Sequence, residues 1–303
     1  MNPCMVSLAD RRTWDLDWLA HELGFDKIAD MSRMVAAIDR RGYTLFVDPK
    51  GGKRRVISAP REWLKDLQKR VYRGILSQLP ISDCAFNAAG RGPIANAMKH
   101  VGKSYMTAVD IENCFPSTSV AKVSKSLRDL GLSETVTGTL TRLTTYHGFL
   151  PQGSPASDAV LNVVFRPIDA ELSELAKRYG ALYTRFTDDL TFSAGRPIRG
   201  LERSIARTLK DFGYRSSPAK LHVWGPADRH IVTGVAVNSR PRPSPRFLWS
   251  LSRDLDRYES GVGDLAENQI RAKINWVYDI DVSVGTALLA RLEKAVRRSG
   301  RLA

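Results

Sequence analysis

Residues 183–193 read YTRFTDDLTFS, and this stretch places two adjacent aspartates, Asp188 and Asp189, between segments that have the pattern of buried strands. Apolar and polar residues alternate on both sides of the pair, which predicts two short strands joined by a tight turn at 187–189. Neighbouring carboxylates repel each other, and removing them from water is costly unless a positive charge lies between them. Aspartate is also a common turn residue, so the pair taken alone favours a surface hairpin.

A third carboxylate changes that balance. Asp110 stands at the end of another apolar strand, predicted over Ser104–Ile111 (SYMTAVDI). Carboxylates from two such strands, brought together, form an oxygen-rich site of the kind that Mg²⁺ prefers. Two ions about 4 Å apart can activate an attacking hydroxyl and stabilise a leaving pyrophosphate. The positive charge that the aspartate pair requires is then predicted to be divalent metal.

The composition points to a polyanionic partner. The chain has 303 residues, 43% of them hydrophobic, and its 46 Lys and Arg residues exceed 32 Asp and Glu residues to give a net charge of +14. A charge of this size favours nucleic acid, although a solvated basic face is the simpler alternative. No apolar run is long enough to span a membrane, the N-terminus lacks the layout of a signal peptide, and the three cysteines share no metal-like spacing. A cytoplasmic protein with no membrane partner is therefore expected.

Strands and helices are interleaved along most of the chain and are followed by an all-helical end, which predicts an α+β fold. A strand pair is expected at Tyr43–Val47 and Arg55–Ser58, and an amphipathic helix at Arg61–Leu79. The segment LPQGSP, Leu150–Pro155, is expected to be a loop that opens a long apolar helix. The proline-rich segment SRPRPSPR, Ser239–Arg246, has the stiffness of a connector between subdomains.

Four short motifs, in this order and spacing, resemble those of reverse transcriptases. They are DIENCF at Asp110–Phe115, LPQGSP, FTDD at Phe186–Asp189, and SPAKLH around Lys220, and the resemblance extends from about Arg55 to Asn238. It implies a right-hand polymerase fold with fingers, palm and a helical thumb. N-terminal helices and fingers would occupy 1–103, the palm 104–238 with a fingers insertion at about 119–150, and the thumb 239–303.

Two further motifs resemble the reverse transcriptases of retrons in particular. NAMKH at Asn96–His100 is similar to their NAxxH motif, and VTGVAVN at Val232–Asn238 is similar to their VTG motif. The chain departs from the family at Thr187, where alanine is usual, and at Phe186, where tyrosine is more common. Threonine is small enough to keep the turn, so these departures do not predict an inactive enzyme.

The resemblance implies a role for each matching residue. Catalysis through two Mg²⁺ ions, for which Mn²⁺ can substitute, is implied for Asp110, Asp188 and Asp189, with the backbone carbonyl of Ile111 as a further ligand. Contacts with the incoming nucleotide are implied for Phe115, Gln152, Gly153, Lys220, Lys53 and Arg55, with Arg54 and Arg61 as further candidates. Contacts with RNA are implied for Asn96, His100, Arg253, Arg257, Arg271 and Lys273, with Arg297 and Arg298 beside them.

Each of these roles has an ordinary structural alternative. Phe115 would be a core aromatic, Gln152 and Gly153 a plain turn, and Lys220 a solvated surface lysine. A lone histidine such as His100 is more often packed or solvated than functional. Several of the thumb cations would serve only solubility.

The predicted activity is RNA-directed DNA synthesis. Resemblance to retrons implies a start from a 2′-hydroxyl in a cognate structured noncoding RNA, a branched RNA–DNA product, and anti-phage defence together with an accessory effector protein. The alternatives are a group II intron or diversity-generating reverse transcriptase, and an inactive polymerase fold that serves as an RNA-binding scaffold. Intact Asp110, Asp188 and Asp189 argue against the scaffold.

Overall fold

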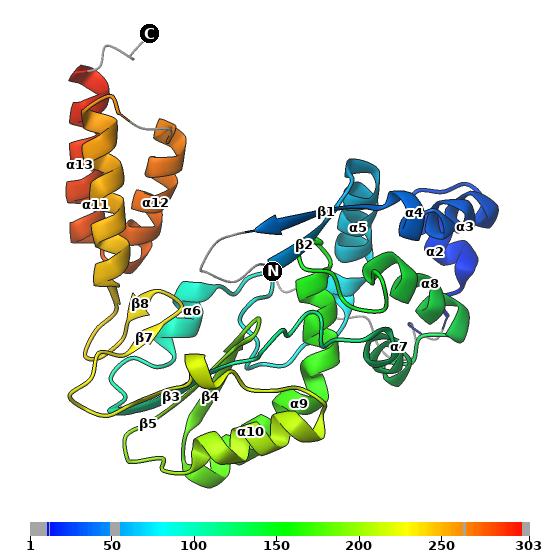
Figure 1. The fold of residues 1–303 in the computed structure, drawn as a ribbon, viewed down its shortest axis with the longest axis horizontal. Helices are drawn as coiled ribbons and strands as arrows, with labels where there is room; N and C mark the ends of the chain where they lie inside the picture. The colour runs from blue at the N-terminus through cyan, green and yellow to red at the C-terminus, as the bar shows by residue number, and fades with distance from the viewer. Residues whose placement is uncertain (1–10, 12, 49–54, 263–264, 299–303) are drawn as a thin grey trace.

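The computed structural model describes residues 11, 13–48, 55–262 and 265–298, and the predicted order of interleaved strands and helices before a helical end is observed (Figure 1). The strands are β1 (Tyr43–Asp48), β2 (Arg55–Pro60), β3 (Tyr105–Asp110), β4 (Leu182–Phe186), β5 (Asp189–Ala194), β6 (His222–Trp224), β7 (Ile231–Val232), β8 (Val235–Ala236) and β9 (Arg242–Pro243). The α-helices are α2 (Leu16–Glu22), α3 (Ile28–Ala36), α4 (Ile38–Arg41), α5 (Glu62–Gly74), α6 (Pro93–Met98), α7 (Val120–Asp129), α8 (Glu134–Thr144), α9 (Ser157–Tyr179), α10 (Leu201–Asp211), α11 (Pro245–Glu259), α12 (Glu267–Ile280) and α13 (Val282–Arg298). Short 3₁₀ turns lie at η2 (Leu76–Gln78) and η3 (Pro218–Lys220).

The central sheet is antiparallel and has the strand order β4-β5-β3-β6. The hairpin predicted around the two aspartates joins β4 to β5, with Phe186 paired to Asp189. Thr187 and Asp188 form the two-residue turn, whereas Asp189 is already the first residue of β5. Thr187 has a φ of +57°, in the left-handed region that tight hairpin turns require and that a β-branched residue rarely adopts.

The main hydrophobic core lies between this sheet and the helices that cover it. α9 and α10 pack on the strands, and α9 also contacts α7. The apolar stripe predicted for the amphipathic helix, namely Leu64, Leu67, Val71 and Ile75, is buried in this core. The same core extends into α2, α3 and α8, so these helices and the sheet form one continuous body.

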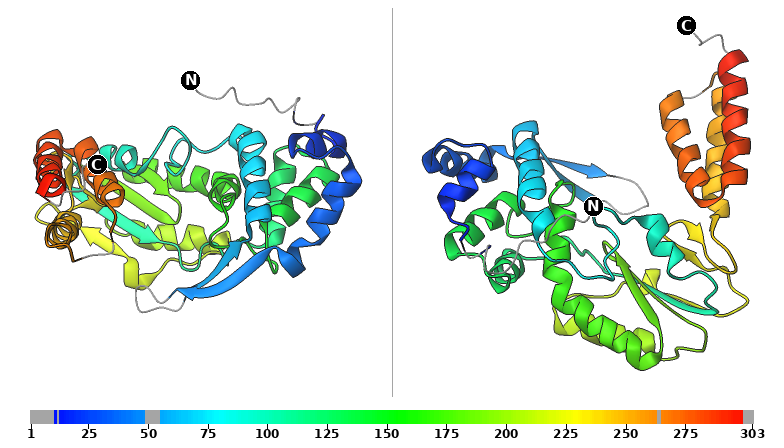
Figure 2. Two further views of the ribbon diagram at one scale, coloured as in Figure 1. Left: turned by 90° about the horizontal axis from the view of Figure 1, so that it is seen from above. Right: turned by 180° about the vertical axis from the view of Figure 1, so that it is seen from behind.

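The three C-terminal helices, α11 to α13, have a core of their own and lie at the opposite end of the sheet from α2, α3 and α8 (Figure 2). A third, smaller cluster of Ala97, Met106, Val232, Val235 and Val237 links α6, β3, β7 and β8. Trp276 and Ile280 of α12 pack against this small cluster. It is therefore the joint between the helical end and the sheet. In the part of the chain that the structure describes, no helix has the length and apolar character needed to cross a bilayer.

Candidate active site

The predicted aspartates meet at one end of the central sheet. Asp110, the last residue of β3, is in register with Asp189, the first residue of β5. The carbonyl oxygen of Asp188 accepts a hydrogen bond from the backbone N–H of Ile111 at 3.1 Å, which ties the turn directly to β3. Side chains that lie 78 residues apart in the sequence (Asp110 and Asp188) are thus held together by backbone pairing.

The carboxylates destabilise one another in the absence of a cation. Burial and the charge of Asp110 raise the pKa of Asp188 above its ordinary value. Burial and the charge of Asp188 raise the pKa of Asp189 to about 6. Asp189 is exposed to solvent, and the protein atoms packed around its carboxylate still desolvate it in part. The site therefore has an excess of negative charge that favours a bound cation.

One lysine already reaches this cluster. Lys220, at the end of η3, forms an ion pair with Asp110 and remains 47% exposed. The loop before it is held by a hydrogen bond from the backbone N–H of Ser217 to the carbonyl oxygen of Asp110, at 2.8 Å. Lys220 is therefore directed at the aspartates and can also reach solvent.

The donor set fits a hard divalent cation. Three carboxylates against a single ammonium leave a net negative charge, and carboxylate oxygens are the preferred ligands of Mg²⁺. In the ranges that the structure describes, no three His, Cys, Asp or Glu side chains already stand in a coordinating arrangement. A cation bound by Asp110 would compete with the ion pair that this residue forms with Lys220.

The predicted nucleotide contacts Phe115, Gln152 and Gly153 lie on turns and loops, the first after β3 and the other two against β2. Phe115 is partly buried against the main core, in the turn that follows β3. The carbonyl oxygen of Gln152 accepts a hydrogen bond from the backbone N–H of Ser58 in β2 at 3.1 Å. Gly153 has a φ of +116°, and a Cβ built on it would lie 3.2 Å from Ile57, so glycine suits both the conformation and the close approach.

The basic fingers residues are placed only in part. Arg55 is the first residue of β2, and Arg61 lies exposed immediately before α5. Lys53 and Arg54 fall outside the described residues. The prediction that these cations contact a triphosphate therefore stays a prediction.

Asn96 and His100 are placed differently from what an RNA contact requires. Their side chains are only 1% and 0% exposed, so neither can touch RNA from this position. The two ring nitrogens of His100 lie 2.7 Å from the hydroxyl oxygens of Ser193 and Thr184 on the central sheet, and burial lowers its pKa to about 3. The prediction of direct RNA contacts by these two side chains conflicts with their burial. Any effect on RNA would pass through the exposed part of the segment, Met98 and Lys99, which they anchor.

The predicted thumb cations divide into two groups. Arg271 and Lys273 form ion pairs within the helical bundle, with Glu267 at 2.6 Å and Asp254 at 2.7 Å. Arg253 lies over the exposed ring of Trp249, at 4.7 Å from its centroid. Among the described residues, Arg257, Arg297 and Arg298 make no ion pair. Contact of any of these cations with RNA stays a prediction.

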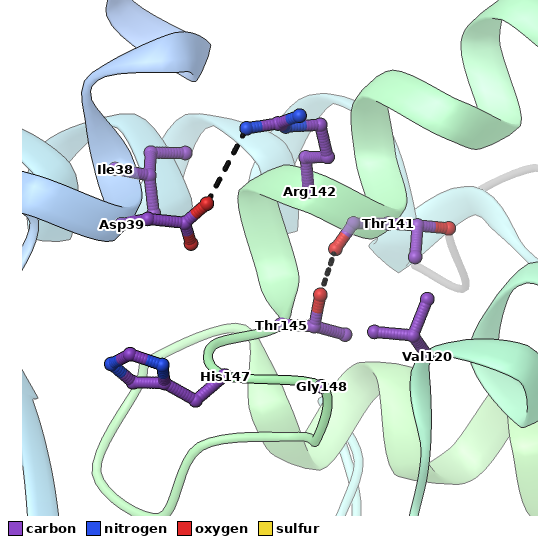
Figure 3. A pocket seen from close by; sticks show the side chains of 8 residues that line it. All are labelled: Ile38, Asp39, Val120, Thr141, Arg142, Thr145, His147 and Gly148. Atoms are coloured by element: carbon purple, nitrogen blue, oxygen red, sulfur yellow. Dashed lines mark hydrogen bonds and ion pairs between the residues drawn. The ribbon is translucent and has the colours of Figure 1, made fainter.

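A separate pocket of about 280 Å³ lies among α4, α8 and the loop that contains His147 (Figure 3). Asp39 and Arg142 on its rim form an ion pair at 3.5 Å, and the Thr145 hydroxyl donates a hydrogen bond to the Thr141 carbonyl. The pocket shares no residue with the aspartate site. Asp39 and Arg142 neutralise each other, so the pocket has no net positive charge from this pair that could attract a phosphate.

Sequence reasoning missed one group next to the site, the buried Arg185. Its side chain is 0% exposed and forms an ion pair with Asp169 of α9. A signal was available in the sequence, since arginine stands between aromatic residues in YTRF, where an interior strand position is expected. Arginine is almost never fully buried unless it is paired, so this position indicated an internal partner.

Comparisons with known proteins agree with these observations. The sequence matches the family described as reverse transcriptase (RNA-dependent DNA polymerase) over residues 47–239. The chain is 30% identical to the retron Mx162 reverse transcriptase of Myxococcus xanthus, over 82% of this chain and 60% of that protein. It is 35% identical to the retron Mx65 reverse transcriptase of the same organism, over 66% of this chain and 52% of that protein. The chain thus spans less than two thirds of the length of these two relatives.

Solved structures show the same fold at low sequence identity. Apo telomerase from Candida tropicalis superposes with a TM-score of 0.53 and 12% identity, over 84% of this chain and 58% of that one. The predicted right-hand polymerase fold and the predicted resemblance to retron enzymes are therefore both confirmed. The chain belongs to the reverse transcriptase family, and within it to the retron type.

Proposed function

We propose that this chain is an RNA-directed DNA polymerase that transfers nucleotides with the help of two Mg²⁺ ions. Reverse transcriptases generally use divalent metal ions. The observation that carries the proposal is the convergence of Asp110, Asp188 and Asp189 at the end of one sheet, in a chain of this family. When bound, the metal would lower the pKa of the attacking 3′-hydroxyl and neutralise charge on the leaving pyrophosphate.

The protein groups have complementary roles in this reaction. The three aspartates supply the oxygen ligands, and the raised pKa values of Asp188 and Asp189 support a cation between them, because a cation would favour the ionised forms. Lys220 can move from Asp110 to the pyrophosphate, where its ammonium would stabilise the leaving group or give it a proton. Gln152 and Gly153, next to β2, would let the backbone approach the nucleotide closely.

We infer further that the template is a structured noncoding RNA of a retron and that the product is a branched RNA–DNA molecule. The names of the relatives and the NAxxH and VTG motifs support this inference. An accessory effector protein and a role in anti-phage defence belong to the same proposal. Primer extension by the purified protein on an RNA template tests the activity, and sequencing the nucleic acid that co-purifies with it tests the template.

Phe115 is expected to exclude ribonucleotides. Phe115 lies in the turn after β3, five residues beyond Asp110, where its ring would meet the 2′-position of an incoming sugar. Replacing Phe115 by valine should therefore raise ribonucleotide incorporation relative to deoxynucleotide incorporation, as measured by competing the two substrates in single-nucleotide extension. Unchanged discrimination in a folded variant would show that Phe115 is only a core aromatic.

The protein is also expected to retain one RNA at high salt. A net charge of +14 binds any RNA weakly, and that binding should collapse as salt rises because it depends on counterion release. Shape-dependent contacts from the α6 segment around Met98 and Lys99, and from the thumb, should persist. Sequencing of RNA recovered by pull-down at roughly physiological and several-fold higher salt measures this difference.

A thumb exchange gives the control for this experiment. A chimera with residues 239–303 from a related enzyme should lose the cognate RNA and still extend an ordinary annealed primer. Recovery of a random sample of transcripts at both salt concentrations would reject the retron assignment and leave the polymerase assignment standing.

A further inference from the structure

The buried side chain of Arg185 connects helix α9 to the turn that carries the aspartates. Its Nε and Nη2 donate to the two carboxylate oxygens of Asp169, each at 2.9 Å, and Nη2 also donates to Asn162 Oδ1 at 3.0 Å. Both partners belong to α9, the long helix behind β4 (Figure 1). The fourth hydrogen bond leaves this network, because Nη1 donates to the carbonyl oxygen of Thr187 at 3.0 Å.

Thr187 is the residue of the turn that most needs an external contact. Its φ of +57° is costly for a β-branched side chain and persists only where the surroundings enforce it. The following carbonyl, that of Asp188, is held by the N–H of Ile111. Two successive carbonyls of the turn are thus fixed from different directions, one by the guanidinium and the other by β3.

The guanidinium itself is held firmly. The backbone of Arg185 is tied to the segment before α6, with its N–H donating to Cys84 at 2.7 Å and its carbonyl accepting from Phe86 at 2.8 Å. The Arg185 Cζ atom lies 4.8 Å from the centroid of the Phe165 ring. The hydroxyl of Tyr183 donates to Asp169 at 2.9 Å and fixes that carboxylate in turn. Arg185 therefore fixes the turn relative to α9, because one guanidinium bonds to both.

The effect of Arg185 on the aspartates is geometric. Both oxygens of Asp169 pair with it, so the buried ion pair is neutral as a whole. The pKa values of Asp188 and Asp189 are raised, and the positive charge that opposes part of this rise is that of Lys220. Arg185 therefore acts on Asp188 and Asp189 by fixing the backbone of the turn that orients their side chains.

We propose that Arg185 is a positioning residue that orients Asp188 and Asp189 for metal binding by holding the carbonyl of Thr187 against α9. This inference rests on the proposed function, since it assigns a task toward the metal ions of that site. Partners that orient ligands in this way typically contribute 10–100-fold to metal affinity or activity.

The first test compares Arg185→Lys with Tyr183→Phe. Lysine keeps the charge opposite Asp169 but has a single nitrogen, which cannot reach Asp169, Asn162 and Thr187 together. The Tyr183→Phe variant removes one hydrogen bond from the same buried network and leaves the link to Thr187 intact, so it is the matched control. Mn²⁺ binding, titrated by electron paramagnetic resonance, should weaken about 10-fold or more in Arg185→Lys and stay near wild type in Tyr183→Phe.

Extension kinetics give the second readout. Arg185→Lys should lower kcat about 10–100-fold per folded molecule, with KM for the nucleotide nearly unchanged and partial recovery at high Mg²⁺ concentration. If its activity loss equals its folded fraction and its Mn²⁺ affinity matches that of wild type, Arg185 has a structural role only and the proposal is overturned.

If Arg185→Lys does not fold, a variant in which apolar side chains replace the buried ion pair tests the proposal instead. Replacing the buried pair and its tyrosine together, as Arg185→Met, Asp169→Leu and Tyr183→Phe, leaves no unpaired charge, and such replacements are often neutral for stability. This folded variant should still show weakened Mn²⁺ binding, and wild-type binding would overturn the proposal. A wild-type protein that binds Mn²⁺ but extends no primer would reject the proposed function alone, because the binding comparison still tests Arg185.

Discussion

Asparagine at both Asp188 and Asp189 is expected to abolish DNA synthesis. An amide keeps the shape of the carboxylate but cannot neutralise a divalent cation, and loss of a catalytic metal site costs several kcal/mol of transition-state stabilisation. Extension should therefore fall below about 1% of the wild-type rate, as measured by deoxynucleotide incorporation on an RNA template. Activity above that level would exclude these residues as the metal ligands.

The fold should survive this double substitution. Because burial and the charge of Asp188 raise the pKa of Asp189 to about 6, ionised Asp189 is disfavoured in the folded protein. As pH rises to about 6, the unfolded state releases the proton of Asp189 more readily than the folded state does, so the folded state loses stability. A neutral amide does not ionise and removes this loss. Thermal unfolding of the metal-free variant at pH 7 to 8 should thus occur at or above the wild-type temperature, with RNA binding retained. A lower unfolding temperature would mean that the loss of activity reflects misfolding.

Alanine at Gly285 is expected to disrupt the packing of the helical thumb. A Cβ on this residue of α13 would lie 2.6 Å from Tyr278 Cβ and 2.8 Å from Tyr278 N, and nearer still to Tyr278 Cα. Backbone atoms of α12 cannot move aside as a flexible side chain would, so the two helices must separate. The loss in free energy of unfolding should lie near the upper end of the range of about 1–3 kcal/mol that over-packed sites show. Hydrogen exchange of residues 245–298 measures it, and should accelerate there while the central sheet stays protected.

Gly138 provides the matched control for this prediction. It lies exposed in the middle of α8, and a Cβ there would meet nothing within 4 Å. Alanine at Gly138 should therefore stabilise the protein by about 0.5–1 kcal/mol, because it lowers the freedom of the unfolded chain without a clash. Equal effects of the two alanine substitutions would show that the α12–α13 contact does not depend on glycine. The thumb core is separate from the main core. Gly285→Ala should therefore weaken the binding of a primer–template while the unfolding temperature of the palm changes little.

Much of the palm could be predicted from the sequence because its signals are local. Alternation of apolar residues around Asp188 and Asp189 marks β4 and β5, and the apolar run before Asp110 marks β3. The side chain of Ser119 caps the N-terminus of α7, and serine is a residue type that favours the start of a helix. In α7 the apolar positions and the final burial follow the helical period, whereas β4 and β5 are buried at consecutive positions, so their burial does not follow the alternation in the sequence.

Contacts between distant segments could not be predicted in this way. His100 lies in the turn that follows the short helix α6. Its ring is buried because it bonds to Ser193 and Thr184 on the sheet, and the local sequence does not reveal these partners. The bond from Arg185 to Thr187 likewise depends on Asp169 and Asn162, which lie on a helix that precedes the hairpin. Sequence pattern indicates that such a side chain is internal, and tertiary packing alone decides what it holds.

The small size of the joint below the thumb has a mechanical consequence. Five buried apolar residues form this joint, together with hydrogen bonds from the Thr233 hydroxyl to the Pro93 carbonyl and from the Gly102 N–H to the Val237 carbonyl, which connect the VTG segment to α6 and the turn after it. The 17-residue helix α13 begins next to this joint and extends away from it for about 25 Å. A rotation of about 10° at its base would carry the far end through an arc of about 4 Å, comparable to a single turn of helix. Both motifs that resemble those of retron enzymes contribute to this joint, Ala97 from NAMKH and Val232, Val235 and Val237 from VTGVAVN. A small change in side-chain volume there would therefore be amplified at the far end of α13.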